Sequence, residues 1–203
     1  MTAGALGGSH AQAATTRGAR ILVLGDSLSA EYGLRRGTGW VALMQARLAS
    51  EHAGVEVINA SISGETTSGG RTRLPALLAQ HKPTHVIVEL GANDALRGLP
   101  LLATQNNLLA ITKAAKKAGC RVALLGMQVP PNYGGQYMRD FGELYVKVAR
   151  AESTQLVPFM LQGVADVADA ERWFQRDRIH PVEAAHPLIL ANVWPVIDAW
   201  FKG

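Results

Sequence analysis

The fold is decided by the stretch Ile21-Leu22-Val23-Leu24-Gly25-Asp26-Ser27-Leu28, in which an apolar run ends at a glycine and a short polar loop. The run does not alternate polar and apolar residues, which is typical of a parallel strand buried on both faces. Similar runs predict strands over 55–60, 85–90 and 121–126, and a brief fifth strand over 156–157.

Apolar residues at helical spacing fill the segments between these strands. Helices are predicted over 40–48, 72–80, 101–118, 141–152 and 184–201. Pro75 is expected in the first turn of its helix, Gly119 as a C-cap, and Pro195 as a bend or break. The longest irregular loop is expected over 128–139. Alternating strands and helices predict an α/β fold with a central parallel sheet of about five strands, covered on both faces.

The length of 203 residues and the apolar content of 48% indicate one globular domain, which we expect over 19–203. Residues 1–18 lack periodicity and are expected to form a disordered arm or the remnant of a leader. Ala11 to Ala14 resemble the end of a signal peptide, although no charged or apolar segment precedes them. No apolar stretch is long enough to span a bilayer.

The net charge of +4 is spread along the chain, so no basic patch for nucleic acid is expected. Cys120 is the single cysteine, which excludes an intrachain disulfide and indicates a core residue. The histidines other than His180 have no ligand-like spacing. No cluster of His, Cys, Asp or Glu predicts a metal site, and no cofactor is expected.

Polar residues follow three of the predicted strands at the point where each strand ends. Ser27 follows the first strand, Gly64 the second and Asn93 the third. The carboxyl ends of parallel strands share one edge of a sheet, where ligands bind near the reversal of strand order. If the first strand lies between the second and third, these groups meet at that edge.

The residue types indicate acyl transfer. A serine hydroxyl needs a base, so Ser27 is the predicted nucleophile and His180 the predicted base. Asp177 can hold the other ring nitrogen of His180 across one turn, which fixes the tautomer. The oxyanion donors are predicted to be the backbone N–H groups of Ser27 and Gly64 and the side-chain amide of Asn93.

Two acids lie beside these groups. Asp26 and Asp94 are interpreted as acceptors that fix loops through backbone N–H groups, and not as proton carriers.

Two other functions remain open at this point. A flavodoxin-like nucleotide or phosphate module could use Ser27 and Ser29, but the chain lacks both glycine-rich phosphate motifs, and Asp177 and His180 would have no role. The same chemistry could act on O-acetylated carbohydrate. Apolar residues near Gly64 favour an acyl chain instead: Leu74, Leu77 and Leu78. The motif G-x-S-x-G is absent, which disfavours a nucleophile elbow.

These motifs resemble the SGNH (GDSL) hydrolases, with Ser27, Gly64, Asn93 and His180 matching the four blocks and Asp177 completing a triad. The chain is most similar to the bacterial thioesterase I/protease I/lysophospholipase L1 and arylesterase group over 20–201. The resemblance implies a three-layer α/β/α flavodoxin-like fold and an acyl-enzyme. It also implies hydrolysis of acyl thioesters, aryl and alkyl esters and lysophospholipids, with water as the second substrate. The group is usually exported, so a periplasmic or secreted location is expected, with a cytoplasmic one as the alternative.

Overall fold

The computed structural model describes residues 18–202, so the predicted arm lies outside the described residues except for Gly18. Five parallel strands form one sheet in the order β2-β1-β3-β4-β5. The strands are β1 Arg20–Gly25, β2 Glu56–Asn59, β3 His85–Glu89, β4 Arg121–Leu125 and β5 Gln155–Val157. The predicted α/β class and five-stranded parallel sheet are therefore confirmed, and β1 does lie between β2 and β3.

The central strands are buried on both faces, as their unbroken apolar runs predict. In β1 every residue from Ile21 to Gly25 is buried, and in β3 every residue is. The edge strand β2 is only partly buried. Each fully buried Leu or Ile contributes about 1.5–3 kcal/mol relative to an exposed one, so the sheet core supplies the scaffold that the loops rely on.

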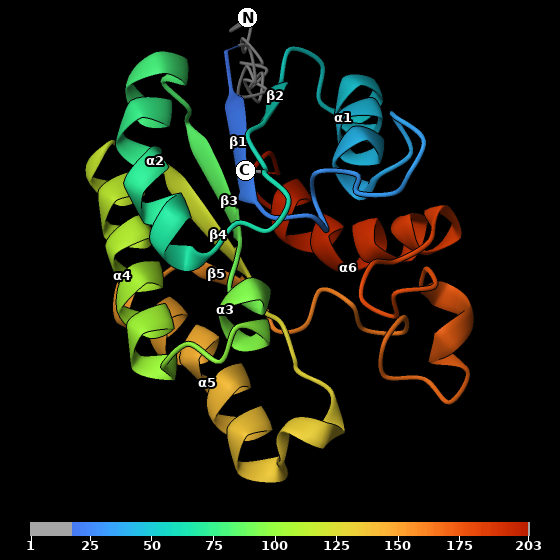
Figure 1. Cartoon of the computed structure of the whole chain (residues 1–203). Coiled ribbons are helices and arrows are strands. Elements are labelled where there is room, and N and C mark those ends of the chain that lie inside the picture. The colour runs from blue at the N-terminus through green and yellow to red at the C-terminus, as the bar shows by residue number, and fades with distance from the viewer. Residues whose placement is uncertain (1–17, 203) are drawn as a thin grey trace, which may run out of the picture.

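Helices cover both faces of the sheet and make three layers. They are α1 Trp40–Glu51, α2 Thr67–His81, α3 Ala92–Leu96, α4 Leu101–Lys117, α5 Gly135–Glu152 and α6 His186–Asp198, with 3₁₀ turns at Pro131–Tyr133, Ala170–Trp173 and Glu183–Ala185. Figure 1 shows α2, α4 and α5 on one face and α1 and α6 on the other. No helix among residues 18–202 has the length and apolar character that crossing a membrane requires.

The prediction for α2 is wrong at its beginning. The helix begins at Thr67 and not at 72, so Pro75 lies in its middle and not in its first turn. Thr66 caps the helix by accepting the N–H of Gly69 at 3.3 Å. A Cβ on Gly70 would lie 2.4 Å from Leu90, so this glycine permits close packing against the end of β3 and does not end a helix.

Helix α5 also begins earlier than predicted. The helix begins at Gly135 and not at 141, so it includes the last part of the loop predicted over 128–139. The first part of that predicted loop also holds a 3₁₀ turn. The Gly134-Gly135 pair suggests a loop from sequence. However, Tyr137 and Met138 pack against the core, and Tyr137 stacks on Phe141 with ring planes 7° apart. This tertiary packing extends the helix.

Two further predictions need correction at the other helices. Pro195 lies inside α6, so a break there is wrong while a bend stays a prediction, and the buried Trp194 and Ile197 hold this last turn against the core. Leu74 is fully buried in the core and Leu77 and Leu78 are partly buried against it, so Leu74 is not placed to face a substrate. By contrast, α4 ends as predicted, with Gly119 at a φ of +85° just beyond it.

Gly91, which separates β3 from α3, should not tolerate a side chain. Its φ is +121°, and a Cβ there would lie 2.3 Å from the hydroxyl oxygen of Tyr145. Gly91→Ala is expected to lower the free energy of unfolding by about 1–3 kcal/mol through strain, with the clash adding to it, as measured by urea denaturation. Gly98→Ala is the matched control, because Gly98 has a φ of +65° but no atom within 4 Å of the added Cβ. Equal losses in the two variants would show that the Tyr145 contact contributes nothing.

Candidate active site

A chain of hydrogen bonds joins three side chains from distant parts of the sequence. His180 Nε2 lies 2.9 Å from Ser27 Oγ, and His180 Nδ1 lies 2.7 Å from Asp177 Oδ2. Ser27 follows β1, whereas Asp177 and His180 belong to the loop before α6. The structure therefore brings together the three residues that the sequence singled out as nucleophile, base and orienting acid.

The turn that carries His180 is built by Asp177. Its Oδ1 accepts the backbone N–H groups of Ile179 at 2.9 Å and of His180 at 3.0 Å, while Oδ2 faces the ring. Arg178 lies inside this turn at a φ of +59°, a left-handed conformation that a side chain disfavours. The strain is held by the two Asp177 bonds, which fix the ring position relative to Ser27.

The ionisation of Asp177 sets the tautomer of His180. Partial burial works to raise the pKa of Asp177, but hydrogen bonds from the backbone and ring of His180 and from Ile179 outweigh it, so the pKa falls to about 2. An ionised carboxylate only accepts hydrogen bonds. Nδ1 therefore carries the ring proton, and Nε2 is free to accept the proton of Ser27.

Two residues that are not evident from the sequence, Tyr32 and Gln175, contact the ring or the backbone of His180. The ring of Tyr32 lies against the imidazole with centroids 4.2 Å apart. Gln175 donates from Nε2 to the carbonyl of Tyr32 at 2.9 Å, and its backbone N–H donates to the carbonyl of His180 at 2.7 Å. Gln175 thus ties the Tyr32 loop to the His180 loop. No local sequence signal marks such a contact, which depends on two loops meeting.

Two of the three predicted oxyanion donors are backbone groups. Among residues 18–202, the N–H groups of Ser27 and Gly64 have no hydrogen-bond partner. Gly64 has a φ of +79°, and its carbonyl accepts from Arg97 at 2.7 Å. Unpaired N–H groups at loop tips are available to a developing negative charge.

The side-chain amide of Asn93 is already engaged. Its Nδ2 donates to Asp26 Oδ2 and to the carbonyl of Glu65, each at 3.0 Å. Asn93 lies in the short helix α3, which the sequence did not predict. An oxyanion that accepted from this amide would have to compete with the Glu65 carbonyl for one of its hydrogens.

Asn93→Ala is expected to lower kcat for ester hydrolysis by about 10²-fold, the usual cost of losing one oxyanion donor. Steady-state kinetics with a p-nitrophenyl ester measure it. The matched control is Asn192→Ala on α6, because Asn192 Nδ2 also donates twice, to the carbonyls of Met160 and Gln162. A fall in both variants by the same factor would remove the special role of Asn93.

Asp94 and Asp26 support the loops around these donors. Asp94 accepts the backbone N–H of Thr67 at 2.9 Å and the hydroxyls of Thr67 and Thr104, which links α3 to α2 and α4. Asp26 accepts the backbone N–H of Leu28 at 3.0 Å through Oδ1. The two carboxyls therefore hold the loops on either side of Ser27 and Asn93.

A second buried acid lies beneath Asp26. Glu89 is fully buried at the end of β3, and its Oε2 accepts the hydroxyl of Ser29 at 2.7 Å. Ser29 itself is buried, so its hydroxyl is not available to a phosphate group as the nucleotide-binding alternative requires. The sequence analysis did not identify Glu89, because it reads as the last residue of a strand.

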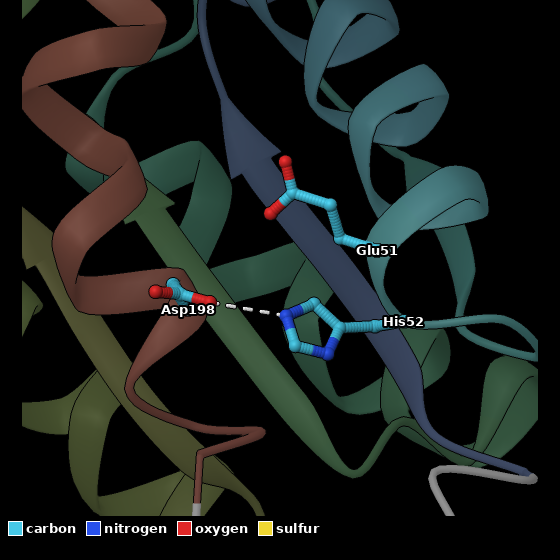
Figure 2. A group of neighbouring side chains, drawn as sticks. All are labelled: Glu51, His52 and Asp198. Carbon is cyan, nitrogen blue, oxygen red and sulfur yellow. Dashed lines mark hydrogen bonds and ion pairs between the residues drawn. The ribbon is translucent and has the colours of Figure 1, made fainter.

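One group among residues 18–202 has the composition of a metal site, but its charges are already paired. Glu51, His52 and Asp198 lie together where α1 meets α6 (Figure 2). His52 Nε2 lies 3.1 Å from Asp198 Oδ1, Lys202 pairs with the other oxygen of Asp198, and Arg47 pairs with Glu51 at 2.8 Å. The cluster is a network of hydrogen bonds and ion pairs that joins the end of α1 to the end of α6.

Comparison with known proteins gives one consistent family. The sequence matches the GDSL-like Lipase/Acylhydrolase family over residues 23–188. It is 51% identical over 177 residues to Esterase TesA of Pseudomonas aeruginosa, covering 87% of each chain. It is 41% identical over 169 residues to thioesterase 1/protease 1/lysophospholipase L1 of Escherichia coli K12, covering 83% of this chain and 78% of that one.

The fold agrees with this assignment. The crystal structure of the psychrotrophic esterase EstA from Pseudoalteromonas sp., inhibited by monoethylphosphonate, superposes with a TM-score of 0.83 at 41% identity, covering 91% of this chain and 99% of that one. Because the family match spans residues 23–188 and the two named relatives are matched over 87% and 78% of their own length, the chain belongs to the GDSL-like lipase/acylhydrolase family of hydrolytic enzymes.

Proposed function

We propose that this protein cleaves carboxylic esters and acyl thioesters through an acyl-enzyme formed on Ser27. The observation that carries the proposal is the pair of contacts that His180 makes, at 2.9 Å to Ser27 and 2.7 Å to Asp177. A neutral imidazole held in this way can take the serine proton and return it to a leaving group. The names of the relatives, an esterase and a thioesterase, agree with this chemistry.

The proposed reaction has two halves. Ser27 Oγ attacks the acyl carbon while His180 Nε2 takes its proton, and the resulting oxyanion lies against the N–H groups of Ser27 and Gly64. His180 then protonates the departing alcohol or thiol as the bond to the acyl carbon breaks. Water attacks the acyl-enzyme in the second half, with His180 as base, and releases the acid and free Ser27.

A fluorophosphonate probe tests the nucleophile, because it mimics the tetrahedral intermediate and bonds to an activated serine. We expect one adduct per chain, located on Ser27 by peptide mass spectrometry, and loss of activity toward p-nitrophenyl butyrate and butyryl-CoA in proportion to labelling. Full labelling at another residue with the same loss of activity would contradict the assignment of Ser27.

Exposed apolar side chains lie close to His180, Gly64 and Asn93 in contact or in sequence, and they favour an acyl chain over O-acetylated carbohydrate as the substrate. Tyr32 contacts His180, Ile62 lies two residues before Gly64, Leu96 follows Asn93 in α3, and Ile179 adjoins His180 in the chain. All four are 45–49% exposed. Apolar groups at the rim of a site stabilise an apolar substrate by removing its surface from water.

The choice between these substrates is tested by kcat/KM along p-nitrophenyl acetate, butyrate and hexanoate, compared with acetylated xylan. One buried methylene is worth about 1–3 kcal/mol of discrimination, so kcat/KM should rise by at least about tenfold from acetate to hexanoate. Faster turnover of acetylated xylan than of any longer ester would favour the carbohydrate alternative.

A periplasmic or secreted location is part of the proposal and is supported by the resemblance of the sequence to an exported group. Fractionation of cells that produce the natural protein, with esterase activity measured in each fraction, tests it. Activity confined to the cytoplasmic fraction would count against export.

A further inference from the structure

Glu89 holds the nucleophile loop on both sides of Ser27. It is the last residue of β3 and pairs in register with Gly25 of β1. Its Oε2 accepts the backbone N–H of Asp26 at 3.2 Å and the hydroxyl of Ser29 at 2.7 Å. These two residues precede and follow Ser27, so one side chain restrains the loop at two points.

A second carboxyl connects Glu89 to the proposed oxyanion site. Asp26 is held by Glu89 Oε2 through its backbone N–H at 3.2 Å, and its own carboxylate accepts from Asn93 Nδ2 at 3.0 Å. Both acids are buried, and no lysine or arginine of residues 18–202 forms an ion pair with either. Two adjacent buried negative charges without a cation repel strongly.

One proton removes this repulsion, and the contacts indicate which acid carries it. Burial and then the charge of Asp26 raise the pKa of Glu89 well above its ordinary range. Burial also raises the pKa of Asp26, to about 6, but the hydrogen bonds from Leu28, Glu89 and Asn93 oppose this. Glu89 Oε1 is buried and accepts no hydrogen bond from residues 18–202, so it is the oxygen that is free to carry the proton.

We propose that Glu89 is a positioning residue that stays protonated at neutral pH and donates a hydrogen bond to Asp26, so that the pair holds Ser27 and Asn93 in reactive geometry. The inference rests on the proposed function, since it concerns the same site. Glu89 keeps its proton throughout turnover. Its role is to let Asp26 remain a single negative charge that accepts from both loops.

The other groups that face the pair do not replace this proton. Tyr145 of α5 is fully buried, its pKa is raised well above the usual value by burial, and its hydroxyl donates to the carbonyl of Leu90. Asp94 of α3 adds a further acid to the same region. His180 acts on Asp26 only when it becomes an imidazolium. Loss of the Glu89 proton at high pH would therefore place a second, uncompensated charge beneath Ser27.

The test compares Glu89→Gln with Glu89→Leu. Glutamine keeps an acceptor for Asp26 and Ser29 and a donor for Asp26, so kcat at neutral pH should remain within about threefold of the natural protein. Leucine keeps the volume but none of the bonds, and kcat should fall by about 10²-fold with a smaller change in KM. Glu143→Gln on the exposed face of α5 is the matched control.

The pH profile separates a proton-holding role from a merely structural one. The natural protein should lose kcat on the alkaline side of its profile, as Glu89 loses the proton that its raised pKa lets it keep at neutral pH. Glu89→Gln cannot lose this proton, so its alkaline limb should lie at higher pH. The proposal would be overturned if the alkaline limb of Glu89→Gln lay at the same pH as that of the natural protein. It would also be overturned if kcat of folded Glu89→Gln fell by more than about 30-fold at neutral pH.

Unfolding experiments give a reading that does not depend on activity. The native pKa of Glu89 lies above the unfolded one, so the native state binds more protons between the two values and becomes less stable as pH rises. Urea unfolding of Glu89→Gln should show a weaker loss of stability with rising pH than the natural protein or the Glu143→Gln control. If the natural protein hydrolyses no ester, the proposed function fails. The pH dependence of unfolding would still decide whether Glu89 is protonated in the native state. Identical pH dependence in all three proteins would show that Glu89 is ionised.

Discussion

Ser27→Ala is expected to lower kcat for p-nitrophenyl butyrate by about 10⁴–10⁶-fold while leaving the fold intact. Alanine removes the only oxygen that lies within reach of His180 Nε2, at 2.9 Å, among residues 18–202. Without it no acyl-enzyme can form. Residual hydrolysis would come from the oxyanion donors acting on water, because the N–H groups of residues 27 and 64 remain in place.

The fold should survive this substitution because, within the described residues 18–202, the Ser27 hydroxyl bonds only to His180. Circular dichroism and the urea midpoint should match those of the natural protein. The fluorophosphonate adduct should disappear. Ser68→Ala, at an exposed position of α2, is the control and should keep both activity and adduct. Retention of more than about a tenth of the natural kcat by Ser27→Ala would contradict the covalent mechanism.

Asp177→Asn should lower kcat by about 10⁴-fold, although it changes a single atom. The asparagine carbonyl can keep the two backbone bonds that Asp177 Oδ1 accepts from Ile179 and His180. The amide nitrogen then faces His180 Nδ1 and donates to it. This stabilises the tautomer with the proton on Nε2, which cannot accept a proton from Ser27.

A second aspartate that also accepts a backbone N–H in its own loop provides the control for Asp177→Asn. Asp166 Oδ1 accepts the backbone N–H of Gly163 at 2.6 Å in an exposed loop, and Asp166→Asn should leave kcat unchanged. KM should change little in Asp177→Asn, because Asp177 acts on the base and does not bind substrate. A loss below about tenfold would mean that His180 does not depend on Asp177 for its tautomer.

Much of the fold could be predicted because strands that are buried on both faces require unbroken runs of apolar residues. Strands β1, β3 and β4 lie in unbroken apolar runs, and their positions were predicted within a residue or two. Helix beginnings were less predictable. Gly70 and Gly134 suggest breaks, but Gly70 is required for contact with Leu90, and α5 begins directly after Gly134 because Tyr137 packs on the core.

For the candidate site, the sequence predicted which reactive side chains take part, but not how far apart they lie. Ser27, Asn93 and His180 stand in recognisable motifs, so their types indicated nucleophile, donor and base. Their mutual distances depend on β1 lying between β2 and β3. Glu89 and Tyr32 could not be identified in this way, because each acts through a residue about 60 or about 150 positions away in the chain.

By itself, the sequence determined that this chain forms a parallel α/β sheet and that serine, histidine and aspartate chemistry lies at its loops, because apolar runs and reactive side chains are local properties. Only the tertiary structure decided that His180 Nε2 lies 2.9 Å from Ser27, that both hydrogens of Asn93 are engaged, and that Glu89 is buried where it accepts from Asp26 and Ser29. Hydrogen bonds act over about 3 Å and buried charges depend on their surroundings, so these features exist only once distant loops are packed against one another.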